Sequence, residues 1–315
     1  MPLDTRISLY KLQVFCHVVE LGGVGRAADH LYVAQPVVSA HLRSLQQRLG
    51  VKLLVRQGRQ MELTEAGAAI YAWAKDTLTR GNEVMREVDG FVDGTAGVAL
   101  VAASMSLGSY LLPPILANFR RERPAANVGL EVTDPQHALD AVQAGACDFA
   151  VVLSEDQPEP QYLTSIELGH EHLLLIAALD GPPESDYITP AQLTKIPLVA
   201  SPRSHGRRSL IDKVLARSGL STGPASIELG HPEAMKRAVG EGLGVSLLFQ
   251  SAVEQELENG MLRRITIDAP PMLVPVFLTH RHDKRLSPLQ RDLVDFVAAG
   301  VRERLSTRGM AAYSS

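Results

Sequence analysis

Apolar residues in the first twenty positions recur at helical spacing. They form one stripe of a helix predicted over residues 8–20: Leu9, Leu12, Phe15, Val18 and Val19. Gly22 and Gly23 end this helix, and a second, short helix is predicted over residues 26–31. Ala27 and Ala28 of the second helix are small enough to let another helix approach closely, as a helix-turn-helix motif requires.

A third helix is predicted to begin at Pro36 and to run to about residue 49. The fixed φ and missing N–H of proline are tolerated at the first helical position. One face of this helix is apolar: Val38, Leu42, Leu45 and Leu49. Polar side chains that can bind DNA bases or phosphates lie at its start and on its other faces: Gln35, Ser39, His41, Arg43 and Gln46.

Two short strands are predicted over residues 51–55 and 60–63, around a turn at Gln57 and Gly58. Arg56 and Arg59 flank this turn. A basic hairpin after a helix-turn-helix fits a wing whose arginines meet phosphates or a minor groove. A solvated surface turn is the alternative interpretation of the same residues.

A stretch without proline follows, from residue 66 to about residue 93. Its apolar positions recur mostly at steps of three and four: Ala66, Ile70, Trp73, Thr77, Val84, Val88 and Phe91. This is a heptad seam, interrupted at Arg80. Such a helix can pack on its own domain or pair with a second chain, and we expect pairing because the helix joins a small unit to a separate body.

From residue 97 short β-branched runs alternate with helical segments, which predicts an α/β unit with largely parallel strands. The expected strands cover residues 98–103, 127–132, 148–153, 171–178, 197–200, 225–229, 245–249 and 274–279. Residues 169–268 are expected to form a second lobe, inserted into a first lobe of residues 96–168 and 269–305. A flexible tail is expected over residues 306–315.

Ligands of open α/β sheets sit beyond the C-terminal ends of the strands, where helix N-termini favour anions. Three expected strand ends carry suitable side chains: Ser104, Met105, Ser106 and Ser109; then Thr133 and Asp134; then Ser201, Arg203, His205 and Arg207. They predict a site for a carboxylate or phosphate. Serines that cap helices and solvated arginines are the alternative, and Asp134 disfavours a densely anionic ligand.

Composition and charge support a folded chain of several domains with a nucleic-acid-binding head. The 315 residues are 45% apolar and 21% charged. Residues 1–65 hold eight basic and five acidic side chains, a net charge of +3, which leaves −7 for the remainder. The two cysteines, Cys16 and Cys147, fit a reducing cytoplasm, and we expect neither a signal peptide nor a membrane span.

Catalysis is the main competing function, and no catalytic motif supports it. The chain has no Gly-x-Ser-x-Gly elbow, no phosphate-binding glycine loop with lysine and no His-Glu-x-x-His helix. The pairs His170/His172 and His280/His282 each supply fewer than the three or four ligands of a metal site. We therefore interpret these histidines as exposed side chains and not as metal ligands. Cys147 has no evident resolving cysteine. We therefore expect neither an enzyme nor a cofactor.

Four segments, in order and spacing, resemble the LysR-type transcriptional regulators. They are Ala-Ala-Asp-His-Leu (27–31), Val-Ala-Gln-Pro-Val-Val-Ser (33–39), Leu-Gly-Val-Lys-Leu-Leu-Val-Arg (49–56) and Leu-Thr-Glu-Ala-Gly (63–67). Further matches extend the resemblance over nearly the whole chain: residues 110–113, Pro124, Gly145 with Asp148, and residues 242–245. The sequence departs from the family at four positions: Ala34, Ala40, Gln46 and Leu54.

The resemblance implies an α+β multi-domain chain. It would comprise a winged helix-turn-helix (residues 1–65), a linker and dimerisation helix (66–95) and a two-lobed α/β effector domain (96–305) like type 2 periplasmic binding proteins. The implied partners are double-stranded promoter DNA, a small-molecule effector in the cleft between the lobes, RNA polymerase and further copies of the chain, as a homodimer and a homotetramer in the cytoplasm.

Because Ala34 and Ala40 offer little polar contact, eight other residues are expected to carry DNA recognition: Arg26, Gln35, Pro36, Ser39, His41, Arg43, Arg56 and Arg59. A head that binds a protein instead of DNA is the remaining alternative, and the salt dependence of DNA binding distinguishes the two.

Overall fold

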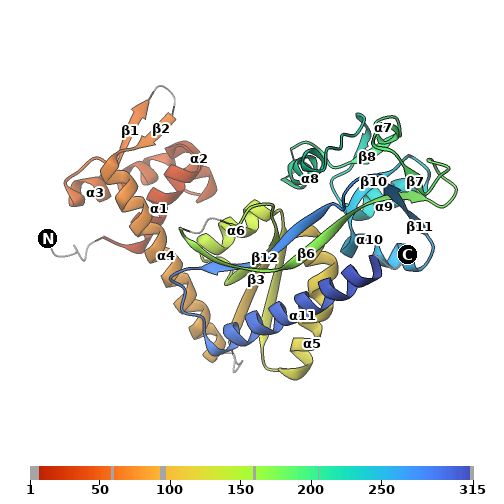
Figure 1. Ribbon diagram of the computed structural model, residues 1–315. Coiled ribbons are helices and arrows are strands. Elements are labelled where there is room, and N and C mark those ends of the chain that lie inside the picture. The colour runs from red at the N-terminus through yellow and green to blue at the C-terminus, as the bar shows by residue number, and fades with distance from the viewer. Residues whose placement is uncertain (1–6, 58–59, 93–96, 159–160, 205, 313–315) are drawn as a thin grey trace. The chain divides into compact units, whose positions relative to one another are not determined.

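The computed structural model describes residues 7–57, 60–92, 97–158, 161–204 and 206–312. The chain divides into two compact units, Met1–Val88 and Asp89–Ser315, whose elements are labelled in Figure 1.

The N-terminal unit is the predicted winged helix-turn-helix. Its elements are α1 (Leu9–Glu20), α2 (Val24–His30), α3 (Gln35–Leu49), β1 (Leu54–Gln57), β2 (Gln60–Leu63) and α4 (Glu65–Val92). The helices enclose a core that includes the fully buried Phe15, Leu45 and Leu53. Ala27 and Ala28 are buried between α2 and its neighbours, so the close helix approach expected from their small size is confirmed.

The long helix α4 serves two kinds of contact along its length. Ile70, Trp73 and Ala74 pack against the core of the N-terminal unit. Val84, Met85 and Val88, farther along the helix, are exposed. The first part of the predicted seam is therefore used within the unit, and the second part presents an apolar surface.

The C-terminal unit is built around a mixed sheet with the strand order β4-β3-β5-β12-β6-β11-β7, in which β10 also pairs with β6. These strands are β3 (Val98–Ser104), β4 (Asn127–Thr133), β5 (Phe149–Leu153), β6 (Leu163–Ala178), β7 (Tyr187–Ile188), β10 (Ser246–Phe249), β11 (Leu262–Ile267) and β12 (Leu273–Arg281). A separate parallel pair consists of β8 (Leu198–Ala200) and β9 (Ala225–Glu228).

Helices cover the strands of the C-terminal unit. A π-helical turn, η1 (Leu107–Leu111), leads into α5 (Leu112–Glu122), and α6 (Pro135–Gln143) follows β4. The other helices are α7 (Pro190–Leu193), α8 (Gly206–Arg217), α9 (Pro232–Gly240), α10 (Gln250–Glu258) and α11 (Pro288–Ala312). Figure 1 shows α11 running alongside the β6–β12 part of the sheet, near α5.

The prediction of largely parallel strands holds for only part of the sheet. β3 pairs in parallel with β4 and β5, but β12 runs antiparallel to both β5 and β6. The predicted strand over residues 171–178 was too short, because β6 begins at Leu163 and pairs with β12 over its first half. The exposed polar residues there, such as Glu167 and His170, interrupt the apolar run on which the prediction relied.

Strands β7 and β11 were not predicted. Arg263 and Arg264 break the apolar pattern of β11. The Arg263 side chain folds back and donates to the carbonyl oxygens of Ala178 at 2.9 Å and Gly181 at 2.8 Å, so a charged residue stabilises the end of β6.

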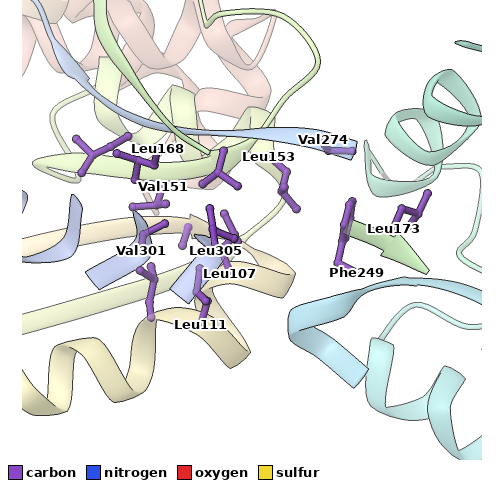
Figure 2. Packing of buried hydrophobic residues seen from close by; sticks show 14 of the residues in the cluster. Leu107, Leu111, Val151, Leu153, Leu168, Leu173, Phe249, Val274, Val301 and Leu305 are labelled. Carbon is purple, nitrogen blue, oxygen red and sulfur yellow. The ribbon is translucent and has the colours of Figure 1, made fainter. Parts of the chain in front are cut away.

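One apolar core runs through the C-terminal unit (Figure 2). Leu107, Val151 and Val301 lie in the part formed by β3, β4, β5, η1 and α11. Leu173 and Phe249 continue the core where β6 pairs with β10. The two lobes are therefore joined by packed side chains as well as by β6 and β12.

Candidate functional site

The outer side of α3 carries side chains that the sequence predicted to contact DNA. Gln35, Pro36 and Arg43 are exposed, and Ser39 is half-buried. The helix begins at Gln35, one residue earlier than predicted, and its N-cap residue Ala34 makes no side-chain capping hydrogen bond. The N–H groups of the first turn therefore have no side-chain acceptor at the cap, which leaves the helix N-terminus suited to a phosphate oxygen.

Two of the other predicted contact residues are held by contacts within the N-terminal unit. Arg26 is exposed, and its Nη2 donates to the carbonyl oxygen of Gly22 at 3.0 Å. His41 is half-buried, and its ring meets the ring of Tyr10 edge-on, with 5.0 Å between the centroids. Tyr10 thus fixes the orientation of His41 on the surface of α3.

The predicted wing is present as an antiparallel hairpin. Leu54 lies opposite Leu63, and Gln57 lies opposite Gln60. Arg56 belongs to β1, but its side chain is outside the described residues, and Arg59 is outside them altogether. Contacts of these two arginines with DNA remain a prediction.

The junction between the wing and α4 explains the Leu-Thr-Glu-Ala-Gly segment. Thr64 Oγ1 donates to the carbonyl oxygen of Lys52 at 2.7 Å and accepts from the Gly67 N–H at 2.9 Å. A Cβ added at Gly67 would lie only 2.0 Å from the carbonyl oxygen of Leu53. Only glycine lets α4 come this close to the chain that enters the wing.

Helix α4 is also tied to α1 through a carboxylate. Glu20 Oε1 accepts from the Tyr71 hydroxyl at 3.1 Å and from Lys75 Nζ at 2.7 Å. The Tyr71 ring packs edge-on against Phe15, with 6.3 Å between the centroids. These contacts and the Gly67 junction fix the direction in which α4 leaves the N-terminal unit.

The C-terminal unit contains a cavity of about 400 Å³ beyond the ends of β3 and β4. Six of the predicted ligand-binding residues line it: Ser104, Met105, Ser106, Thr133, Asp134 and Arg207. Sequence reasoning missed several further lining residues, among them His137, Leu153, Leu210 and Phe249. The cavity therefore combines a polar end with an apolar wall.

Arg207 is the cationic group that lines this cavity most deeply. Its side chain is only 9% exposed. Nε donates to Ser201 Oγ at 2.8 Å, and Nη2 donates to the carbonyl oxygen of Gly230 at 3.3 Å. No carboxylate among the described residues forms an ion pair with Arg207, and burial lowers the pKa of its guanidinium, an effect that Tyr110 opposes. A buried cation with only neutral partners is suited to binding an anion.

The remaining residues of the predicted 201–207 cluster have different environments. Ser201 is buried behind the cavity wall, where its hydroxyl holds Arg207. Arg203 is exposed and does not line the cavity. His205 lies outside the described residues. The sequence could place these residues in one loop but could not show that Arg207 lines the cavity while Arg203 does not.

Asp134 and His137 form a pair at the polar end of the cavity. Asp134 caps α6, and its Oδ1 accepts from the Gln136 and His137 N–H groups at 3.0 and 3.1 Å, while Oδ2 contacts the His137 ring. Partial burial favours a higher pKa for Asp134, but these hydrogen bonds outweigh it and the pKa is lowered. The hydrogen bond to Asp134 raises the pKa of His137.

Both carboxylate oxygens of Asp134 contact groups of α6. Asp134 therefore repels an anion in the cavity less than its charge alone would suggest. An added Cβ at Gly206 would lie 3.7 Å from Asp134 Oδ1, which shows how closely the start of α8 approaches α6.

A hydrogen bond between the lobes lies near this cavity. The Tyr110 hydroxyl, at the end of η1, donates to Glu233 Oε1 on α9 at 2.6 Å. Lys236 Nζ contacts Glu233 Oε1 at 2.6 Å and Glu256 Oε1 at 2.7 Å, and it lies 4.9 Å from the centre of the Tyr110 ring. Burial and the bond to Glu233 raise the pKa of Tyr110, so its hydroxyl stays a donor.

The metal-binding alternative considered from the sequence has no assembled site among the described residues. Among the described residues, no group of three or more His, Cys, Asp or Glu side chains is arranged to hold a metal ion. His280 Nδ1 lies 2.9 Å from the carbonyl oxygen of Arg281, and His282 Nδ1 lies 3.1 Å from Thr164 Oγ1. None of the helices in the described ranges has the length and apolarity that a bilayer crossing requires.

Two family models match the chain. The model for the LysR substrate binding domain matches residues 93–302. The model described as "Bacterial regulatory helix-turn-helix protein, lysR family" matches residues 9–68. Together they cover the helix-turn-helix and the cavity.

Whole-chain similarities agree with these models. A probable RuBisCO transcriptional regulator of Synechocystis is 32% identical over 263 residues, which span 82% of this chain and 76% of that protein. The crystal structure of ArgP from Mycobacterium tuberculosis has a TM-score of 0.61 at 23% identity, covering 95% of this chain and 98% of that one. Vibrio fischeri DarR, solved in complex with DNA, has a TM-score of 0.54 at 19% identity, covering 93% and 99%. At these identities the two structures establish the fold.

Proposed function

The chain belongs to the LysR family of DNA-binding transcriptional regulators, which carry an effector-binding domain, and on this premise we propose that its effector is a small anionic metabolite held between the two lobes of that domain. Residues 1–65 would form the DNA-binding domain, 66–95 the linker helix and 96–305 the effector domain, with lobe one at 96–168 and 269–305 and lobe two at 169–268.

The observation that carries this proposal is the environment of Arg207. A guanidinium loses hydration when it is buried, and its neutral acceptors, Ser201 Oγ, Gly230 O and Met235 Sδ, replace only part of what water supplied. An anionic group in the cavity would complete its hydrogen bonds, since a carboxylate matches the planar donor geometry of arginine. Leu153, Leu210 and Phe249 would contact the carbon skeleton of the same ligand.

The side chains around the cavity favour an organic acid of moderate size. The volume of about 400 Å³ lies in the lower part of the range typical of small-molecule sites. Ser106 and Thr133 offer hydroxyls to the ligand, and the imidazole of His137, whose pKa is raised by Asp134, lies at the polar end. Ser104 acts behind them, because its buried Oγ accepts from the Leu153 N–H at 3.3 Å.

Ligand binding would control DNA binding through the relation between the lobes. An anion bound at Arg207, on α8, would also touch residues that follow β3 and β4, so its binding would favour a closed arrangement. The ligand can shift this equilibrium only by the difference in its affinity for the two arrangements.

For DNA we propose that the exposed start of α3 enters the major groove. Gln35 and Arg43 would contact base edges together with Pro36 and Ser39, while Arg26 and His41 would support binding to the backbone. Arg56 and Arg59 would extend the interface along the wing. The exposed residues Val84, Met85 and Val88 support pairing of α4 with a second copy of the chain.

A homodimer of this kind would present two heads to two half-sites. Membership of the family supports the further proposals of a homotetramer, of contact with RNA polymerase and of a cytoplasmic location.

The test compares two arginines of the same loop region. Full-length protein is screened by thermal shift against small mono- and dicarboxylates, phosphorylated metabolites, and neutral and cationic amines. We expect an anionic ligand to raise the melting temperature. Arg207→Met should weaken its binding roughly 10- to 150-fold, the equivalent of one charge-assisted hydrogen bond of about 1.5–3 kcal/mol.

Arg203→Met is the matched control, because Arg203 is exposed and outside the cavity, and it should leave the affinity unchanged. A neutral or cationic ligand that binds wild type and Arg207→Met equally well would refute the anionic class. Dependence of promoter binding on the same ligand, measured by electrophoretic mobility shift, would connect the cavity to regulation.

A further inference from the structure

The turn between α2 and α3 has a backbone geometry that usually calls for glycine. The Val33 N–H donates to the carbonyl oxygen of Ala28 at 3.0 Å, and the Tyr32 N–H donates to that of Asp29 at 3.2 Å. These two bonds make a Schellman motif at the end of α2, with Tyr32 at the left-handed position. Its φ is +54°, and Tyr32 is the only non-glycine residue with positive φ in the part of the chain that the structure describes.

The described residues of the N-terminal unit do not account for a tyrosine at this position. The Tyr32 side chain is 96% exposed, whereas Tyr162, the next most exposed large apolar or aromatic residue among those described, is 61% exposed. An L-residue with a bulky side chain is sterically disfavoured in the left-handed region, and glycine is not. Tyr32 therefore carries a conformational cost that packing against the described residues does not offset.

The position of Tyr32 places it beside the surface that faces DNA. Tyr32 precedes Ala34, the N-cap of α3, by two residues. The exposed surface continues from Tyr32 through Ala34 to Gln35, Pro36 and Val37. In a helix-turn-helix, the N-terminal residues of the second helix enter the major groove, so the turn that leads into this helix lies near the groove edge, where the phosphates are.

We propose that Tyr32 is a DNA-contact residue, which donates its hydroxyl to a backbone phosphate at the edge of the major groove and packs its ring on the adjoining sugar. Tyrosine hydroxyls are among the side-chain donors that bind phosphate oxygens, and such contacts fix the register and orientation of the protein on the duplex. The contact is uncharged, so it adds affinity without releasing a counterion.

The proposal predicts that stability and DNA binding change in opposite directions in Tyr32→Gly. Without the side chain, the left-handed backbone is unstrained, so the N-terminal unit should resist urea better than wild type. Trp73, the single tryptophan of the sequence, packs on the core of this unit, so its fluorescence reports the unfolding of that unit. DNA affinity should nevertheless fall, by about three- to tenfold or more.

DNA binding is measured on full-length protein by fluorescence anisotropy, with a mixed-sequence duplex and with a duplex selected from a random library. Tyr32→Phe keeps the ring and the strain but removes the hydroxyl, so it should lose part of the affinity on both duplexes equally. The slope of log affinity against log salt concentration should stay at the wild-type value in both variants. Tyr162→Phe is the control for an exposed tyrosine in the other unit and should change nothing.

Wild-type affinity in both Tyr32→Gly and Tyr32→Phe would overturn the proposal. So would a loss of affinity in Tyr32→Gly that is accompanied by weaker resistance to urea, because that result assigns Tyr32 a role in folding instead of contact. These measurements need no effector, so they stand apart from the test of the anion proposal.

Discussion

The contact between Gly67 and the wing yields a prediction whose sign is opposite to that of helix propensity. Gly67 lies in the first turns of α4, and alanine in a helix interior is ordinarily favoured over glycine by about 0.8–1.0 kcal/mol. At this position, however, the added Cβ would lie 2.0 Å from Leu53 O and 2.9 Å from Leu53 C. Both are backbone atoms, so no side-chain rotation relieves the overlap.

The cost of Gly67→Ala can be estimated from what has to move. Relieving the overlap requires a shift of more than an ångström between α4 and the strand that begins the wing. Such overpacking costs about 1–3 kcal/mol. Leu53 O also accepts from the Thr64 N–H at 3.0 Å, and the loss of this bond adds about 0.5–1.5 kcal/mol. After subtraction of the propensity gain, we expect net destabilisation of about 0.5–3.7 kcal/mol.

The assay is urea unfolding of the full-length protein followed by Trp73 fluorescence, with DNA binding measured at a urea concentration where the variant is still folded. Gly81→Ala is the matched control, because Gly81 lies in the same helix and its added Cβ meets nothing within 4 Å. It should stabilise the unit by up to about 1 kcal/mol. Equal effects of the two substitutions would show that the approach of α4 to Leu53 is not what requires glycine.

Two further predictions concern the C-terminal unit. Tyr110→Phe and Glu233→Ala should each weaken effector binding, because the first removes the donor and the second removes the acceptor of the hydrogen bond between the lobes. A double-mutant cycle on the affinity should give a coupling energy of about 0.5–3 kcal/mol, and additive losses would contradict a role for this bond. The pKa of His137, followed by NMR, should lie above 6.5 and fall towards 6.5 in Asp134→Asn. The contribution of His137 to stability should be complete below pH 6.5 and disappear as the pH rises through its raised pKa. The contribution of Asp134 to stability should be complete above pH 3.8 and disappear as the pH falls through its lowered pKa. A His137 pKa that Asp134→Asn leaves unchanged would contradict the interaction between the two side chains.

Periodicity and the turn residues predicted the helices of the N-terminal unit closely, but they placed the first wing strand at residues 51–55, whereas β1 is Leu54–Gln57. The buried stripes of α1 and α3 are regular, and Pro36 marks the start of α3 to within a residue. Periodicity could not show that Ile70 and Trp73 pack on their own unit, because the same heptad pattern serves a partner helix or a neighbouring core equally well. The distinction depends on the Gly67 junction and the Glu20 contacts, which join residues far apart in sequence.

Part of the cavity lining could also be predicted, from the positions of strand ends and not from periodicity. Ser104 and Thr133 could be placed because residues that follow parallel strands gather at one edge of a sheet. Arg203 and Arg207 could not be distinguished from each other, because their orientation is set by tertiary contacts of the loop with Ser201 and Gly230. Tyr32 was not among the DNA-contact residues predicted from the sequence, because the hydrophobic pattern indicates neither its left-handed backbone nor its exposure.

The pairing of β6 with β12 determines how the effector domain can deform. These two strands are hydrogen-bonded to each other from Leu163 to His172 and then lead into the second lobe. Sliding one of these strands along the other would break all the hydrogen bonds of their ladder at once, whereas bending need not. Its regularity is interrupted near Gly169, where φ is +137° and the register shifts between Val276 and Phe277.

We therefore expect the lobes to move by bending near Gly169 and not by sliding along β6 and β12. The residues that line the cavity lie outside these two strands. Substitutions in the cavity should therefore change the choice of ligand and leave the strands that join the lobes unaltered.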